Sequence, residues 1–288
     1  MLIKRVLTAI ILAPAAIAAI FYLPLNYFAG LLLAILAIGA WEWGPLMGFA
    51  GKTRRLIFVL TNILLITLIW RFFPLEKLWI AKHELDQSVV YMLWIAVAWW
   101  ALSAGLTLLY PRCSSFWSSH RSIRGIFGWL TLVPTWLAFL VIRSSEYQSD
   151  TYHGAQLIMF LFLMVWSADI GAYFVGKSLG KHKLLPNVSP GKTMEGFIGG
   201  VAVACILVSI AGYIMNWQSH QFLLVLAVTV VITTISVLGD LNESMFKRQA
   251  GIKDSGSILP GHGGILDRID SLTATAPIYA LCYVIIGW

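Results

Sequence analysis

The sequence predicts an all-α integral membrane protein, a helical bundle with about nine transmembrane helices. Of its 288 residues, 59% are hydrophobic and only 11% are charged, and the mean hydropathy is +0.81. Soluble domains carry about 25% charged residues. The apolar runs are also too long and too poor in charge for the core helices of a soluble α/β protein. A polytopic membrane protein is the class that fits these observations.

Each predicted span is close to the ~20 residues with which a helix crosses a bilayer. The spans lie at residues 6–23, 27–48, 55–73, 89–109, 125–142, 155–176, 196–216, 222–241 and 271–288. The first one follows two basic residues and ends in small residues, as a signal peptide does. Its length and the further spans close behind it predict an uncleaved helix instead.

We expect three regions along the chain, although no internal repeat or low-complexity linker marks their borders. Residues 1–75 would hold the N-terminal transmembrane helices, and residues 76–150 a middle transmembrane hairpin. Residues 151–288 would form the C-terminal catalytic region.

Positive charge orients the bundle, because cytoplasmic loops of membrane proteins are enriched in Lys and Arg. With a cytoplasmic N-terminus, nine spans place 16 of the 20 Lys and Arg residues on the cytoplasmic side. The other side keeps Arg71, Lys77, Lys82 and Arg143. The unusual loops 177–195 and 242–270 then face the cytoplasm, where nucleotides are available.

Two features of the composition exclude other functions. The three cysteines, Cys113, Cys205 and Cys282, are too far apart in sequence for a metal or redox motif. The formal net charge of +7 is explained by topology and by anionic lipid headgroups, so we expect no nucleic-acid partner.

Four aspartates lie inside or at the ends of predicted spans: Asp169, Asp240, Asp267 and Asp270. An unpaired carboxylate in hydrocarbon costs ~2.5–3.5 kcal/mol on insertion scales, so these residues need partners. Asp267 and Asp270 are three residues apart and share one helix face. If they face Asp240, the three carboxylates suit Mg²⁺ together with substrate phosphate oxygens. The alternatives are ion pairs with Lys247 or Arg268, or a favourable position at a helix N-terminus.

The two polar loops add further candidates. The segment SPGKTMEGFIGG (residues 189–200) lacks the first glycine of a P-loop, where Pro186 stands, and no buried strand is expected before it. Ser189, Lys192 and Thr193 would bind phosphate at a helix N-terminus, or Ser189 or Thr193 would simply cap the helix.

The sequence does not decide the role of several other side chains. His262, within PGHGG, would contact phosphate, relay a proton or serve only the turn. Glu243 and Lys247 are four residues apart and can pair. Glu42 lies between two tryptophans that suit interfacial anchoring, and it is assigned no role.

The run from Ser244 to Asp270 resembles the signature of the phosphatidate cytidylyltransferase (CDP-diacylglycerol synthase) family, bacterial enterobacterial type. The matching positions are Ser244, Phe246, Lys247-Arg248, Lys253-Asp254, Gly256, Leu259-Pro260, His262-Gly263-Gly264 and Asp267-Arg268-x-Asp270. The upstream WSADIGAYFVGKSLGKHKL and SPGKTMEGFIGG also look like the family. The specific resemblance covers about residues 155–288, whereas the first half is similar mainly in hydropathy and in Trp41-Glu42-Trp43.

The resemblance implies an enzyme that converts CTP and phosphatidic acid to CDP-diacylglycerol and pyrophosphate in phospholipid biosynthesis. It implies Mg²⁺ dependence, with K⁺ as a second cation. It also implies a homodimer in the bacterial inner membrane, for which residues 76–150 would be the dimerisation region, and a polar cavity open to the cytoplasm and to lipid. The family's metal-binding acids map onto Asp240, Asp267 and Asp270.

Our mechanistic hypothesis is metal-assisted attack of the lipid phosphate on the CTP α-phosphorus. The expected catalytic residues are Asp240, Lys247, Arg248, Lys253, Asp267 and Asp270. The expected substrate-binding residues are Asp169, Ser189, Lys192, Thr193, His262 and Arg268. The bases would hold the β- and γ-phosphates of CTP.

Two other functional classes share some of these features. A secondary transporter would also use intramembrane acids such as Asp169 and Asp240, but it would show an inverted repeat. A CDP-alcohol phosphotransferase also handles lipid and metal, but its acid-rich motif is missing from this sequence.

Overall fold

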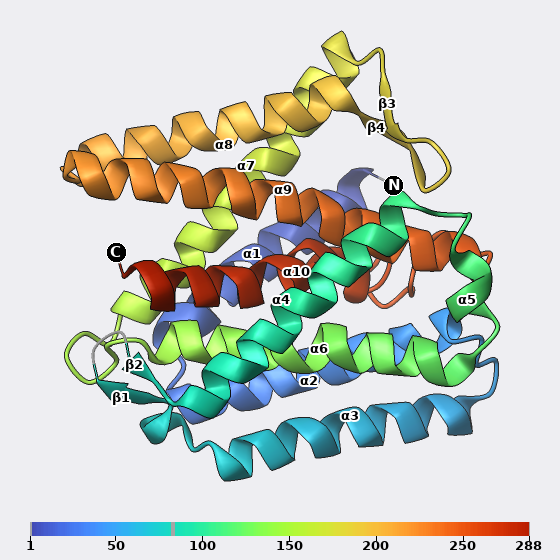
Figure 1. Cartoon of the computed structure of the whole chain (residues 1–288), viewed down its shortest axis with the longest axis horizontal. Coiled ribbons are helices and arrows are strands. Elements are labelled where there is room, and N and C mark those ends of the chain that lie inside the picture. Colours follow the sequence, from blue (N-terminus) through green and yellow to red (C-terminus); the bar gives the residue numbers. More distant parts are fainter. Residues whose placement is uncertain (1, 82–83, 288) are drawn as a thin grey trace.

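Figure 1 shows the computed structural model of the chain, which describes residues 2–81 and 84–287. Nine long helices run through this part of the chain, so the prediction of about nine is confirmed. They are α1 (Leu2–Tyr22), α2 (Leu25–Leu46), α3 (Lys52–Phe72), α4 (Gln87–Leu108), α6 (Arg121–Ser144), α7 (His153–Leu179), α8 (Met194–Ile214), α9 (Ser219–Gln249) and α10 (Leu266–Ile286). Lys82, and Trp288 at the end of the ninth predicted span, lie outside the described residues.

Eight of these helices, α2 to α4 and α6 to α10, are long and apolar enough to cross a membrane. Helix α1 contributes a shorter apolar segment, Ile10–Tyr22. Many large apolar side chains face outward on these helices, among them Ile57, Leu64 and Ile206, as expected where lipid replaces water around a helix. The chain is therefore a polytopic all-α membrane protein.

The last two helices extend further into the signature than we predicted. Helix α9 continues to Gln249, and α10 already begins at Leu266. The polar loop is thus residues 250–265 instead of 242–270. Glu243 and Lys247 continue the helical spacing of α9, and the first helix-breaking residue after them is Gly251, which has a φ of 70°.

Several short elements interrupt the all-helical pattern. A 3₁₀ turn (Leu75–Lys77) precedes the paired strands β1 (Trp79–Ala81) and β2 (Glu84–Leu85), and α5 (Ser114–Ser118) lies between α4 and α6. Strands β3 (Lys183–Leu185) and β4 (Ser189–Thr193) form an antiparallel hairpin, with Lys183 opposite Thr193. The sequence predicts no buried strand before residues 189–200, and β3 is indeed exposed or half-buried, although the hairpin itself was not predicted.

The connections gather at the two ends of the bundle. The α2–α3 turn, α5, the β3–β4 hairpin and the 250–265 loop lie at one end, which we call the basic end because most of the Lys and Arg residues are there (Figure 1). The β1–β2 pair, the α8–α9 turn and the C-terminus lie at the other end. This is the alternation that the charge pattern predicted.

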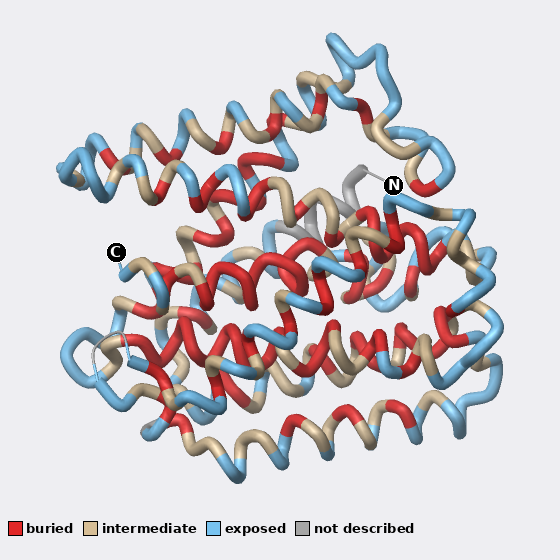
Figure 2. Tube along the Cα trace, in the orientation of Figure 1, coloured by how far each residue is buried: buried red, intermediate tan, exposed pale blue. Residues whose placement is uncertain are grey.

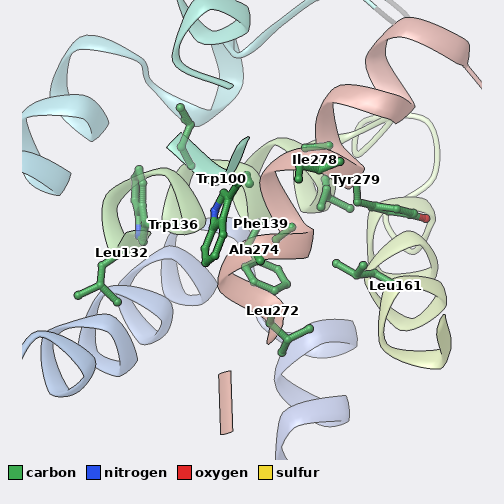
Figure 3. Packing of buried hydrophobic residues seen from close by; sticks show 14 of the residues in the cluster. Trp100, Leu132, Trp136, Phe139, Leu161, Leu272, Ala274, Ile278 and Tyr279 are labelled. Carbon is green, nitrogen blue, oxygen red and sulfur yellow. The ribbon is translucent and has the colours of Figure 1, made fainter. Parts of the chain in front are cut away.

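The core surrounds α10 and α6, whose residues are largely buried, whereas α3 and α8 are exposed along much of their length (Figure 2). Figure 3 shows buried side chains of this core, among them Trp100 of α4, Trp136 of α6, Leu161 of α7 and Tyr279 of α10. Because α10 is central, its first turn is held in a fixed place at the basic end, next to α9.

Candidate functional site

A polar cavity of about 720 Å³ opens at the basic end between α7, β4, α9 and α10. Its ionisable lining residues are Asp169, Lys177, Lys192, Asp240, Lys247, Asp254, Asp267, Arg268 and Asp270. The cavity also has apolar walls from Val165, Phe197 and Leu272. Acids, bases and apolar surface thus meet where a membrane interface is expected, which suits a ligand with a charged head and an apolar tail.

Helices α9 and α10 cross closely beside the cavity. A Cβ on Gly239 would lie 2.8 Å from the Ala274 Cβ and 2.9 Å from the Asp270 carbonyl oxygen, so only glycine fits there. Ser271 Oγ donates a hydrogen bond of 3.1 Å to the Ser236 carbonyl across the same crossing. This close approach brings the cavity-lining carboxylates Asp240 and Asp270 into electrostatic range of each other.

The β3–β4 hairpin contributes a base to the opposite wall. Lys192 Nζ lies 2.6 Å from Asp240 Oδ2, and both side chains keep about a third of their surface exposed, 27% and 34%. Asp169, in the middle of α7, lies within electrostatic range of Lys192, Asp240 and Arg268. These four charges form the exposed floor of the cavity, so they are free to exchange partners with a charged ligand.

Lys247 is bound far more tightly. Its Nζ lies 2.9 Å from Glu243 Oε2 and 2.7 Å from Asp267 Oδ1, and all three side chains are less than a tenth exposed. The predicted Glu243–Lys247 pair is confirmed. Because breaking a buried ion pair leaves an uncompensated charge, Lys247 has little freedom to leave these acids for a substrate phosphate.

Asp267 is the structural centre of the 250–265 loop. Its Oδ1 accepts from Lys247, and its Oδ2 accepts 3.0 Å bonds from the backbone N–H and the hydroxyl of Ser255 and a 2.8 Å bond from the Gly264 N–H. Both carboxylate oxygens are therefore occupied by protein donors. Asp270, by contrast, makes no bond to the loop: it accepts the N–H of its neighbour Ser271, at 2.7 Å, and interacts with the Glu243 carboxyl group on α9.

The donor set fits Mg²⁺ in part. Among the described residues, no group of three or more His, Cys, Asp or Glu side chains is placed to hold a metal ion. In phosphate sites, however, Mg²⁺ is usually held by one or two carboxylates, with waters and substrate phosphates as the other ligands. Asp240 and Asp270 match that set, whereas Asp267 is engaged elsewhere.

The segment 189–200, which resembles a P-loop in part, forms the capped N-terminus of α8. Thr193 Oγ1 accepts a 3.1 Å bond from the Gly196 N–H and is the N-cap of α8. Glu195, in the first turn of α8, accepts from the Lys181 and His182 backbone N–H groups and from His182 Nδ1, the last at 2.6 Å. These bonds fix the base of the hairpin and so aim Lys192 at the cavity.

The structure brings together eight of the twelve predicted site residues. Asp169, Lys192, Thr193, Asp240, Lys247, Asp267, Arg268 and Asp270 border the cavity, and Ser189, Arg248, Lys253 and His262 do not. Arg248 instead donates a 3.2 Å bond to the Val188 carbonyl and ties the hairpin to α9. His262 is half-buried within the turn closed by Leu259 and Gly263.

Three further charged residues were missed. Asp254 of the 250–265 loop borders the cavity. Lys177 also borders it, one turn above Tyr173, and its Nζ lies 5.6 Å from the centre of that ring. The pattern Trp166, Asp169, Tyr173 and Lys177 at helical spacing is the signal that would have found it. Glu42 is only 2% exposed and binds the 250–265 loop, although no nearby sequence feature indicates such contacts.

Comparison with known proteins places the chain among enzymes. The model of the cytidylyltransferase family matches residues 3–286. A phosphatidate cytidylyltransferase from Haemophilus influenzae is 41% identical over 290 residues, covering 98% of this chain and 99% of the relative. One from Pseudomonas aeruginosa is 39% identical over 288 residues, covering 100% and 99%. A shorter match, 50% identical over 142 residues, covers 49% of this chain and 54% of a Staphylococcus aureus phosphatidate cytidylyltransferase.

Proposed function

The chain belongs to the cytidylyltransferase family and is a membrane-embedded enzyme, and from this premise we propose that it makes CDP-diacylglycerol and pyrophosphate from CTP and phosphatidic acid. The names of the full-length relatives support this reaction. They do not favour the transporter alternative. The observation that carries the proposal is the cavity at the basic end, where acids, bases and apolar walls meet.

The reaction joins two phosphates that both carry negative charge. A phosphatidate oxygen forms a bond to the α-phosphorus of CTP, the bond from that phosphorus to the bridging oxygen breaks, and pyrophosphate leaves with the electron pair. Such transfers depend on charge neutralisation and in-line positioning more than on covalent chemistry. The exposed cavity charges, Lys192, Arg268 and Lys177, supply positive charge for this purpose.

We propose that Asp240 and Asp270 hold the Mg²⁺. When bound there, the metal would neutralise phosphate charge and align the two substrates. The Lys192 ammonium, which lies against Asp240 in the structure, would then turn toward a substrate phosphate. The resemblance also implies Asp267 as a ligand and K⁺ as a second cation. The bonds of Asp267 to Lys247, Ser255 and Gly264 support a holding role for it instead.

The remaining predicted residues take positions around this centre. Thr193 orients Lys192 by capping α8, and Asp169 balances the charge of Lys192 and Arg268. Arg248 secures the hairpin. Lys253 is exposed on the loop, where it would meet the outer phosphates of CTP, as would Ser189 and His262 if the hairpin and the turn close over the nucleotide.

The proposed setting is the bacterial inner membrane, with the basic end and the cavity facing the cytoplasm. The concentration of Lys and Arg at this end supports that orientation. The apolar cavity walls would take the acyl end of the lipid. Homodimer formation is proposed from the family resemblance alone, and cross-linking in native membranes would test it.

The test is turnover of purified, detergent-solubilised protein with phosphatidic acid and labelled CTP, with and without Mg²⁺. CDP-lipid and pyrophosphate should form in equal amounts, and only when lipid and Mg²⁺ are both present. A folded protein that makes no product with any of several phosphatidic acids would overturn the proposal.

A further inference from the structure

Glu42 is a buried carboxylate that binds the catalytic loop from a distant part of the sequence. It lies on α2 and is 2% exposed. Its Oε2 accepts a 2.8 Å hydrogen bond from the backbone N–H of Leu266, the first residue of α10, which is 224 residues away. The same oxygen lies 3.3 Å from the Ser255 hydroxyl, in the middle of the 250–265 loop.

The bond to Leu266 does the work of a helix cap. The first N–H groups of a helix have no partner within it, and a negative charge there is favoured by the helix dipole. The residue before α10, Ile265, makes no side-chain capping bond. Glu42 therefore stabilises the start of α10 from another helix.

The loop backbone is built around this carboxyl group. A Cβ placed on Gly256 would meet three atoms of the Glu42 side chain before any others, and one on Gly264 would lie 2.5 Å from Glu42 Oε2. Gly256 and Gly264, both within the loop, thus allow its backbone to approach the Glu42 carboxylate. Any larger residue at either position would displace it.

The contacts continue to the cavity. The Ser255 hydroxyl also lies 3.0 Å from Asp267 Oδ2, and Asp267 Oδ1 binds Lys247. Three residues after Asp267 on α10, Asp270 borders the cavity within electrostatic range of Asp240. A shift at Leu266 would therefore move both the buried Lys247 pair and the carboxylate that borders the cavity.

We propose that Glu42 is a positioning residue for the transferase reaction: it holds the 250–265 loop and the first turn of α10 so that Asp267 and Asp270 keep their places. The inference rests on the proposed function for its effect on turnover. The restraint of the 250–265 loop by Glu42 does not depend on the proposed function. Glu42 does not border the cavity and touches no substrate in this scheme.

The experiment compares Glu42→Ala and Glu42→Gln with Ser145→Ala, a control of equal burial at the other end of the bundle, where Ser145 donates to the Tyr283 hydroxyl. Hydrogen–deuterium exchange is measured on peptides covering residues 252–266, and turnover is measured with CTP and phosphatidic acid. Glu42→Ala should speed exchange in this segment alone and lower turnover about 10-fold or more. Glu42→Gln, which keeps an acceptor oxygen, should stay within about 3-fold of wild type on both measures, as should the control.

A double-mutant cycle separates positioning from general damage. Gly256→Ala pushes against Glu42, so it should lower turnover about 10-fold alone but add less than about 2-fold in the Glu42→Ala background. If Glu42→Ala does not fold, Glu42→Asp, which withdraws the carboxylate by one methylene, takes its place. Unchanged exchange in residues 252–266, or effects of the two substitutions that multiply, would overturn the proposal. A wild-type protein without turnover would refute the proposed function, while the exchange comparison would still decide the role of Glu42.

Discussion

Lys192 Nζ lies 2.6 Å from Asp240 Oδ2 and joins the β3–β4 hairpin to α9 beside the cavity. The two residues are 48 positions apart and belong to different polar segments. Their contact closes the charged floor formed with Asp169 and Arg268. Because both side chains stay partly exposed, the pair contributes little to stability. The pair instead keeps each side chain beside the cavity, where it can bind a ligand of the opposite charge.

Asp240→Asn should therefore reduce activity without unfolding the protein. The substitution removes the carboxylate that we propose as a metal ligand, and turnover should fall by about 100-fold or more, as when one electrostatic group is lost from a transfer site. The measurement is pyrophosphate release at several Mg²⁺ concentrations, with thermal melting in detergent beside it. Asp150→Asn, an exposed acid at the opposite end, should change neither. Full activity of Asp240→Asn would end the metal assignment.

The two acids of the first α10 turn should behave differently. Asp267 accepts bonds from Lys247, Ser255 and Gly264, so Asp267→Asn breaks a buried ion pair and should cost about 3–5 kcal/mol of stability. Asp270 lies in electrostatic range of two other acids, Asp240 and Glu243, and Asp270→Asn removes a repulsion that outweighs its longer-range attraction to Lys247. We expect it to melt at or above the wild-type temperature and yet to lose turnover.

Melting curves of both variants in the same detergent, with turnover measured on each, check this difference. Equal destabilisation by the two substitutions would contradict the separate roles that the hydrogen bonds indicate. A stable, active Asp267→Asn would do so as well.

The sequence predicted the helices, and the gathering of several charged residues beside one polar space, for one physical reason. Long apolar runs can only be membrane helices, and charges that interrupt them, such as Asp169 and Asp240, must face a polar space. The pairing of Glu243 with Lys247 followed from their spacing in one helix. These inferences needed only local sequence, and the structure bears them out.

What could not be predicted depends on contacts between distant segments. The partners of Glu42 lie 213 and 224 residues further along the chain, and its flanking tryptophans indicate only an interface. Asp267 and Asp270 look alike in sequence, but only Asp267 meets the backbone of the folded loop. The β3–β4 hairpin was missed because a short polar hairpin has no hydrophobic alternation to reveal it.

Two roles of Thr193, capping α8 and binding a substrate phosphate, can be separated by substitution. Thr193 Oγ1 accepts from the Gly196 N–H, so Thr193→Val should destabilise the protein by about 1 kcal/mol and lower turnover by misplacing Lys192. Thr193→Ser keeps the hydroxyl and should restore both properties. Melting temperature and turnover of the two variants provide the test. If serine restored stability but not turnover, the methyl group would matter and capping alone would be insufficient.

Lys177 offers the sharpest test of nucleotide binding, because it borders the cavity and no acid is bound to it in the described structure, where its Nζ lies over the Tyr173 ring. If it meets a phosphate of CTP, Lys177→Met should raise the KM for CTP about 10-fold, since a charge-assisted hydrogen bond is lost. The matched control is Lys181→Met, an exposed lysine four residues further along that does not border the cavity. Steady-state kinetics at low and high salt measure the effect, which should shrink as salt screens the charge. An unchanged KM for CTP in Lys177→Met, or an equal rise in Lys181→Met, would show that the lysine only adds to the general positive charge of this end.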